Sequence, residues 1–224
     1  FYPMGLTFPM REGVLRIFLR SISMTTMTTV HADTASEGQL NWAVAKTLGM
    51  ALREPVSAKD EDFAGMAVPF KLYDVFNSGS DEVPYYEIRV VTVTRHGILP
   101  DASAPTVDVE YFSERLGRNV RALSTVDFYF ASREEAEVDV NASMRGIYDE
   151  DFRPVLDWNF VGEFIDGLDI VFTRADRYRV RAFLDGSDDQ GEQTFSIGEN
   201  HREAAIRLYV KLKLGDRFQS PASI

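Results

Sequence analysis

The chain has 224 residues, enough for one large domain or two small ones with a substantial hydrophobic core. Hydrophobic residues make up 45% of it, which excludes wholesale disorder, and the absence of cysteine excludes disulfides, thiolate nucleophiles and cysteine-ligated metals. A net charge of −11 disfavours direct binding to nucleic acid or to an anionic membrane, and no apolar run reaches the roughly 20 residues of a membrane-spanning helix.

Residues 1–35 are expected to lie outside the fold, as a disordered or non-native N-terminal extension. Residues 11–23 mix arginines with aliphatic residues and precede a run of threonines, which resembles an organellar transit peptide. The alternative is translated sequence upstream of a true start at Met24 or Met27, and we favour it. Residues 36–224 are predicted to form a single domain.

The first clear element is a helix that begins after Ser36. Ser36 and Gln39 have the spacing of a capping box, in which each side chain satisfies a backbone N–H at the start of the helix. Apolar residues then recur every four positions over residues 40–52, which places them on one face of the helix. Gly49 weakens the helix and is a candidate for an early end, and Pro55 ends it in any case.

The middle of the chain is predicted to be mixed. Residues 55–83 are expected to be irregular, ending in the turn sequence NSGSDEVP. Residues 85–94 are rich in aromatic and β-branched side chains and predict a strand. Residues 109–117 are predicted to form a short helix, residues 120–132 a second strand, and the capping-box pattern of Ser132 and Glu135 a further short helix.

Two strands of different character are predicted at residues 167–174 and 177–184. The second alternates Arg177, Arg179 and Arg181 with less polar residues, so one of its faces is expected to be wet and basic. An acidic hairpin tip at residues 185–193 then leads to a short returning strand.

The last helix has a clear beginning and a clear end. Asn200 and Glu203 supply its N-terminal cap, and Gly215 supplies the left-handed residue that ends helices. Its apolar stripe must pack on the preceding strands, and we expect it to share a hydrophobic core with the first helix. The predicted fold is therefore α+β, a mainly antiparallel sheet with an N-terminal and a C-terminal amphipathic helix packed on it.

Three segments of the sequence carry a family resemblance. LNWAVAKTLG (residues 40–49), PVLDWNFVGEFID (residues 154–166) and AAIRLYVKLKLGD (residues 204–216) occur in this order. They resemble, in the same order, the conserved stretches of the phage and prophage NinX-like family of small proteins of unknown function. The positions that match are Leu40, Trp42, Ala43, Val44, Ala45, Lys46, Asp157, Trp158, Arg207, Tyr209, Val210, Lys213, Leu214, Gly215, Asp216 and Pro221.

The resemblance implies a context rather than a mechanism. It implies a phage or prophage gene that acts in the bacterial host cytoplasm, which argues against a transit peptide. The family brings no established activity and no catalytic residues. Because the family is shorter than this chain, residues 60–150 are interpreted as a candidate insertion.

The motif positions supply the candidate binding residues, which are Trp42, Lys46, Asp157, Trp158 and Arg207. The two tryptophans, the only ones in the chain, could stack on a base or anchor a partner. They could instead bridge the first helix to the central segment of the chain. Asp157 is expected to cap a helix or to form a turn.

No catalytic site, metal site or cofactor is predicted. His31, His96 and His201 lack the spacing of metal ligands, and in the calcium-loop-like sequence DGSDDQGE, Gln190 stands where glycine is required. No phosphate-binding glycine loop, Gly-x-Ser-x-Gly turn or zinc-binding helix motif occurs. Enzymatic activity is unsupported rather than excluded.

We therefore expect a non-enzymatic phage accessory protein that binds a host or phage macromolecule. A protein partner is favoured, and a homo-oligomer is left open. The acidic residues between 132 and 151 could imitate a phosphate backbone or simply form a solvated face. The alternative function is a pocket for a nucleotide-like ligand, in which Trp42 or Trp158 stacks and Lys46, Arg207 or an arginine of residues 177–181 meets the phosphate. A hydrolase would need several carboxylates at one point.

Overall fold

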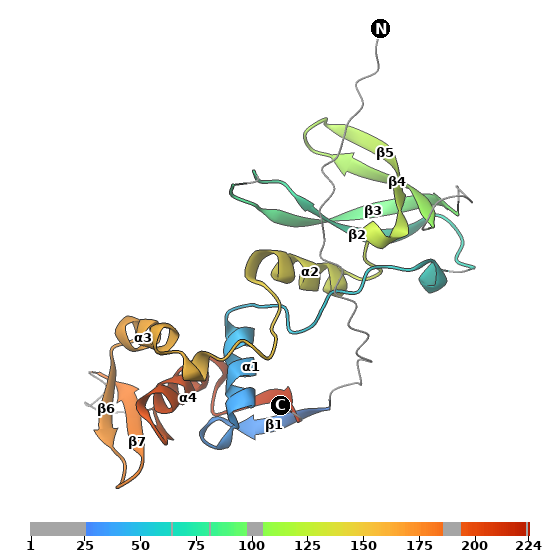
Figure 1. Cartoon of the computed structure of the whole chain (residues 1–224). Helices are drawn as coiled ribbons and strands as arrows, with labels where there is room; N and C mark the ends of the chain where they lie inside the picture. Colours follow the sequence, from blue (N-terminus) through green and yellow to red (C-terminus); the bar gives the residue numbers. More distant parts are fainter. Residues whose placement is uncertain (1–25, 64, 81, 98–104, 186–193, 223) are drawn as a thin grey trace.

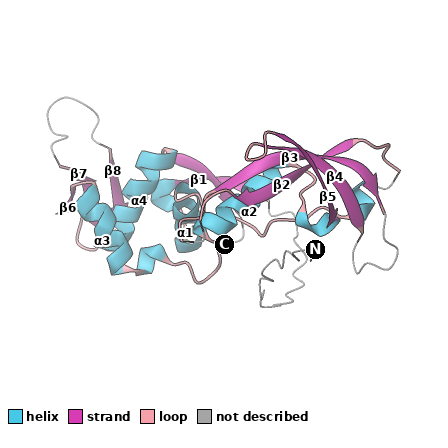
Figure 2. Cartoon of the chain, turned by 90° about the horizontal axis from the view of Figure 1, so that it is seen from above, coloured by secondary structure: helices cyan, strands magenta, loops and turns pink. Residues whose placement is uncertain are grey.

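The computed structural model describes residues 26–63, 65–80, 82–97, 105–185, 194–222 and 224. These residues form two lobes at opposite ends of an elongated molecule (Figures 1 and 2). The helical lobe contains α1 (Glu37–Thr47), α3 (Trp158–Gly167) and α4 (His201–Leu214). The sheet lobe contains α2 (Arg133–Arg145) and a four-stranded sheet.

Every pairing between named strands in the described part of the chain is antiparallel. The helical lobe holds two small sheets, and their strands are β1 (Met27–His31) with β9 (Arg217–Pro221), and β6 (Ile170–Arg174), β7 (Val180–Leu184) and β8 (Phe195–Gly198). The sheet of the other lobe consists, in spatial order, of β2 (Phe70–Asn77), β3 (Tyr86–His96), β4 (Thr106–Ser113) and β5 (Arg118–Thr125). The predicted α+β class is confirmed, with three antiparallel sheets.

The first and last helices share one hydrophobic core. Leu40 of α1 and Leu208 of α4 are fully buried in the same cluster. The hydroxyl oxygens of Thr47 and Tyr209 lie 3.0 Å apart, which joins the two helices at the surface of that core. The Tyr209 ring also stacks on Phe164 of α3, with centroids 4.1 Å apart. The packing of the last helix on the first, expected from their apolar stripes, is therefore confirmed.

The predicted N-terminal caps of α1 and α4 and the predicted end of α4 are confirmed, whereas α1 ends at Thr47, before Gly49 and well before Pro55. The Ser36 hydroxyl accepts from the Gln39 N–H, and the Gln39 side chain accepts from the Ser36 N–H. Asn200 accepts from the Glu203 N–H, and Gly215 follows α4 with a φ of 90°, a conformation that glycine adopts without strain. These local signals are readable because a cap depends on residues only three positions apart.

The sheet lobe has a core of its own. The second hydrophobic cluster shares no residue with the first, and its fully buried members on the sheet include Val91 and Val93 of β3 and Val109 of β4. The lobe lies within the segment that the resemblance marks as an insertion. Two predictions in this region are wrong. Residues 109–117 are not a helix but the end of β4 and a turn, and residues 55–83 contain β2.

The boundary predicted at residue 35 is also wrong. Residues 26–35 belong to the helical lobe, because β1 pairs with β9 along its whole length and a 3-10 turn, η1 (Ala32–Thr34), follows it. Ala32 and Ala35 are buried in the first core. Residues 1–25 and most of the predicted acidic hairpin tip, residues 186–193, lie outside the described residues.

The two lobes are joined by the segments that follow α1 and α2. These segments meet where the Ala51 N–H donates to the Gly146 carbonyl over 3.0 Å and the Tyr148 N–H donates to the Ala51 carbonyl over 2.7 Å. Arg53 forms a bidentate ion pair with Glu135 at the start of α2. That pair lowers the pKa of the Glu135 carboxyl, and a hydrogen bond from the backbone N–H of Val56 lowers it further.

Candidate functional site

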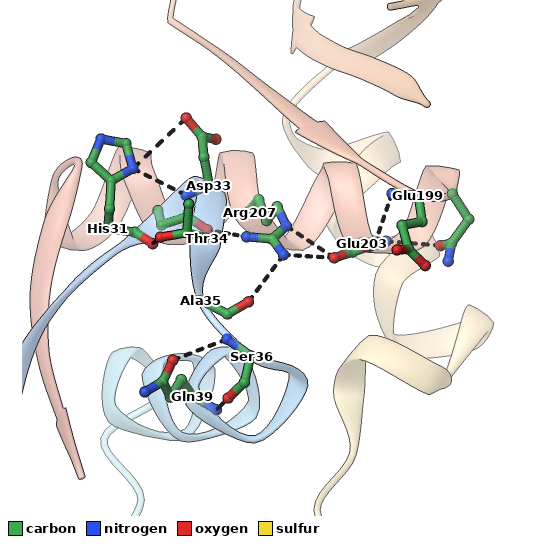
Figure 3. Close-up of polar contacts among 11 residues, drawn as sticks. His31, Asp33, Thr34, Ala35, Ser36, Gln39, Glu199, Glu203 and Arg207 are labelled. Atoms are coloured by element: carbon green, nitrogen blue, oxygen red, sulfur yellow. Dashed lines mark hydrogen bonds and ion pairs between the residues drawn. The ribbon is translucent and has the colours of Figure 1, made fainter. Parts of the chain in front are cut away.

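Arg207, a motif residue of α4, is used within the fold (Figure 3). Its Nη2 donates to the Ala35 carbonyl over 3.0 Å, and its Nη1 donates to the Ala32 carbonyl. Its Nε and Nη2 both donate to Glu203 Oε1, over 3.1 and 2.6 Å. These bonds engage four of the five N–H groups of a guanidinium, and only 9% of the side chain is exposed. Arg207 therefore clamps η1 onto α4 and has little left to offer a ligand.

Trp42 and Lys46 lie one turn apart on α1. Trp42 is 5% exposed and belongs to the first core. Lys46 is exposed, with its Nζ 5.2 Å from the centroid of the Trp42 ring. The ammonium group therefore lies over the edge of the core, and the indole is covered by packing rather than open for stacking on a ligand.

Asp157 and Trp158 have separate roles at the start of α3. Asp157 caps the helix, because its Oδ1 accepts from the Asn159 N–H over 2.9 Å and from the Phe160 N–H over 3.4 Å. This confirms its predicted role. Trp158 is 53% exposed, with the Arg202 guanidinium 5.4 Å from the centroid of its ring.

The interpretation that both tryptophans bridge the first helix to the central segment fails for Trp158, which is exposed, whereas Trp42 is buried in the cluster that also contains Val155 and Val161. A polar contact between the two segments is made by Asn41, whose buried Oδ1 accepts from the Val155 N–H over 3.3 Å. Of the candidate residues, Trp42 and Arg207 are thus built into the core, whereas Trp158 is presented to solvent. The five residues do not form one site.

A different exposed feature lies at the turn between β6 and β7, at the lower end of the orange hairpin (Figure 1). Asp176 Oδ1 accepts from the backbone N–H groups of Tyr178 and Arg179, both over 2.9 Å. Asp176 Oδ2 accepts from Arg179 Nε over 2.6 Å. These bonds, led by the one from the Tyr178 N–H, lower the pKa of Asp176. They fix the turn, so that Tyr178 projects outward with 76% of its surface exposed.

An open groove of about 330 Å³ separates this turn from the first turn of α4. The side chains that matter for its chemistry are Phe172, Arg174, Arg177, Tyr178, Val180 and His201. The His201 ring meets Phe172 edge-on, with centroids 5.0 Å apart. The groove therefore combines apolar and cationic side chains, and Asp176 is the acid among its lining residues.

The charged side chains along the groove differ in whether they have an ion-pair partner. Asp176 is neutralised by Arg179, whereas neither Arg174 nor Arg177 has a carboxylate partner among the ion pairs of the described residues. Glu199 is the other acid that lines the neighbouring depression at this turn. This surface is therefore locally cationic on a chain of net charge −11.

Two sets of side chains that flank the first turn of α4 are together named the arginine–aromatic face: Arg174, Arg177, Tyr178 and His201 in the groove, and the contacting pair Trp158 and Arg202. Its two halves meet at the first turn of α4, where His201 contacts Phe172 and Arg202 contacts Trp158. The sequence indicated the basic character of residues 177–181, but nothing in it showed that Trp158 and Arg202 lie at the same end of the lobe.

Among the described residues, no cluster of three or more histidine, aspartate or glutamate side chains could hold a metal ion. No helix in that part of the chain combines the length and apolarity needed to cross a bilayer. Comparison with protein-family models, curated proteins and solved structures finds no match.

Proposed function

We propose that this chain is a non-enzymatic binding protein that contacts a partner protein through the arginine–aromatic face. The observation that carries the proposal is the exposure of Trp158 and Tyr178 beside Arg177 and Arg202. Tryptophan, tyrosine and arginine are the residues in which binding energy at protein interfaces is concentrated. Lysine, which interfaces disfavour, is not part of this face.

The setting of this function is proposed from the family resemblance alone. The three motifs favour an accessory protein of a phage or prophage, acting in the cytoplasm of the bacterial host on a host or phage protein. The arginine–aromatic face contains one residue of those motifs, Trp158 of the second, and the third motif begins at Ala204, two residues after Arg202. Arg207, a residue of the third motif, holds η1 on α4, the helix whose first turn carries His201 and Arg202.

The charge of the chain favours a protein over a nucleic acid as the partner. A polynucleotide that extends beyond the face would meet a surface with 35 acidic residues against 24 basic ones. Its phosphates would be repelled there, and the release of counterions that drives binding would be small. A partner protein whose contact surface is about as large as the face does not extend over those acidic residues, and it avoids this repulsion.

The alternative, a nucleotide-like ligand held by Trp42, Lys46 and Arg207, receives less support. Trp42 is buried, and the donors of Arg207 are engaged by Glu203 and by backbone carbonyls. A stacking role remains open to Trp158, which is exposed. That role serves a protein partner equally well, since aromatic rings anchor interfaces by burying a large area.

The experiment is co-purification from phage-infected bacteria, followed by binding measurements with the purified partner. Trp158→Ala and Tyr178→Ala are each expected to weaken binding about thirtyfold or more, because hot-spot residues contribute at least about 2 kcal/mol. Phe112→Ala and Phe128→Ala are matched controls, since both side chains are exposed aromatics of the sheet lobe. A partner that binds all four variants alike would exclude this face, and recovery of no partner would count against the function.

A further inference from the structure

We propose that the groove beside the β6–β7 turn receives a carboxylate side chain of the partner protein, held between Arg174 and Arg177. The inference rests on the proposed function and adds the chemistry of the partner, an acidic residue next to an apolar one. The groove can contact both residues of the partner, because Arg174 and Arg177 line it together with the apolar side chains of Phe172 and Val180.

The first step of the inference is the state of the two arginines. Both line one groove, and neither has a carboxylate partner among the described residues. Two guanidinium groups at one site repel each other, and the repulsion falls when an anion lies between them. The planar guanidinium fork matches a carboxylate in two parallel hydrogen bonds, so a carboxylate is the natural ligand.

The second step is that hydrogen bonds hold the β6–β7 turn in one conformation before a partner binds. Asp176 is the acid closest in sequence to Arg177 and also lines the groove, but its carboxylate is engaged by the Tyr178 and Arg179 N–H groups and by the Arg179 side chain. The Ala175 N–H also donates to the Arg179 carbonyl over 3.0 Å, which closes the turn. Because the backbone is ordered before binding, little conformational entropy is lost when the partner arrives.

The third step concerns the neighbours of the carboxylate. Tyr178 projects from the turn beside the Arg177 guanidinium, which lies 5.4 Å from its ring centroid. An apolar side chain next to the acid would contact this ring and the part of the groove where Phe172 meets His201. A nucleic acid would place further phosphates near Glu199 and the acidic remainder of the chain, which opposes it.

The test is selection of random peptides displayed on phage particles against the immobilised full chain. Peptides that bind the wild type are then measured in solution against Arg174→Ala/Arg177→Ala and against Arg174→Gln/Arg177→Gln, which retains side-chain volume. Arg115→Ala/Arg118→Ala is the matched control, because it removes two exposed arginines beside the β4–β5 turn of the sheet lobe. A circular dichroism melt verifies that each variant is folded.

The expected result is enrichment of peptides with aspartate or glutamate next to an apolar residue. Their affinity should fall about tenfold or more in both groove variants and should be unchanged in the control. The inference would be overturned if the selected peptides lack acidic residues and bind the groove variants as tightly as the wild type. If those peptides bind Trp158→Ala or Tyr178→Ala more weakly, the proposed function still stands. If the affinity of no selected peptide depends on any residue of the face, both the inference and the proposed function are overturned. If a thymidine oligonucleotide binds more tightly than the selected peptides, and its binding requires Arg174 and Arg177, then the ligand of the groove is a nucleic acid and not a protein carboxylate.

Discussion

The guanidinium of Arg207 donates to the Ala35 carbonyl over 3.0 Å and thereby joins positions that are 172 residues apart in sequence. Ala35 directly precedes the residue that caps α1, so this bond fixes the start of the first helix against the last one. The Glu203 carboxylate balances the buried positive charge from the preceding turn of α4. A motif residue that resembles a ligand-binding arginine in sequence is thus a structural residue.

Arg207→Ala should lower the free energy of unfolding by about 3 kcal/mol or more. The substitution leaves the Glu203 carboxylate without its partner and two carbonyl groups without donors in a largely buried place. Urea unfolding measures the change. Arg133→Ala, which removes an exposed i,i+4 pair with Glu137 from α2, should cost at most about 0.5 kcal/mol. Equal effects of the two substitutions would contradict the clamp.

The two tryptophans should respond differently to substitution. Trp42→Ala should cost about 3 to 5 kcal/mol of stability, since it opens a cavity in the first core. Trp158→Ala should change stability by less than about 1 kcal/mol, because the ring is 53% exposed. Iodide quenching separates them without unfolding. Trp158→Phe, which retains Trp42, should be quenched less than Trp42→Phe, and the reverse order would show that the wrong indole has been placed in the core.

Gly198→Ala should destabilise the helical lobe by about 1 to 3 kcal/mol, as overpacking does. A Cβ at this position would lie 2.5 Å from the Ala204 backbone nitrogen, so β8 and the first turn of α4 would have to separate. Gly162→Ala in α3 is the control. Nothing lies within 4 Å of its added Cβ, and the helix should gain about 0.5 to 1 kcal/mol. Thermal unfolding compares the two, and a stabilised Gly198→Ala variant would refute the close approach.

The ion pair between Arg53 and Glu135 predicts an acid-sensitive contribution to stability. The Arg53 hydrogen bond lowers the pKa of Glu135 in the folded protein. The ionised carboxylate therefore adds stability above its unfolded pKa, about 4.3, and that stability is lost as the pH falls through the folded value. Glu135→Gln should be less stable than the wild type at pH 7, with the difference narrowing below pH of about 4.3. Parallel stability curves from pH 7 to pH 3 would contradict the assignment.

Local patterns in the sequence predicted the helices better than the strands. The caps of α1 and α4 depend on residues three positions apart, so Ser36 with Gln39 and Asn200 with Glu203 were sufficient. The helix predicted over residues 109–117 misses β4, because the alternation of buried Val107 and Val109 begins before that segment. β1 depends on pairing with β9 at the other end of the chain, which no local pattern reveals.

The candidate site was predictable only in part. The exposed position of Trp158 and the burial of Trp42 are set by tertiary packing, since both stand in similar apolar sequence. The alternation of arginines over residues 177–181 predicted a strand with one basic face, but β7 begins at Val180, and Arg177 and Arg179 lie in the turn that precedes it. Only the fold places Arg174 and Arg177 along one groove with His201, and Trp158 beside Arg202.

Hydroxyl-radical footprinting of the complex with the partner protein tests the central claim most directly, because it reports the exposure of each aromatic ring. The arginine–aromatic face predicts that Trp158 and Tyr178 lose reactivity on binding. Phe112 and Phe128, which are exposed on the sheet lobe, should keep the reactivity that they have in the free protein. Protection of Phe112 and Phe128 with no change at Trp158 and Tyr178 would show that the partner binds the other lobe and would contradict the account.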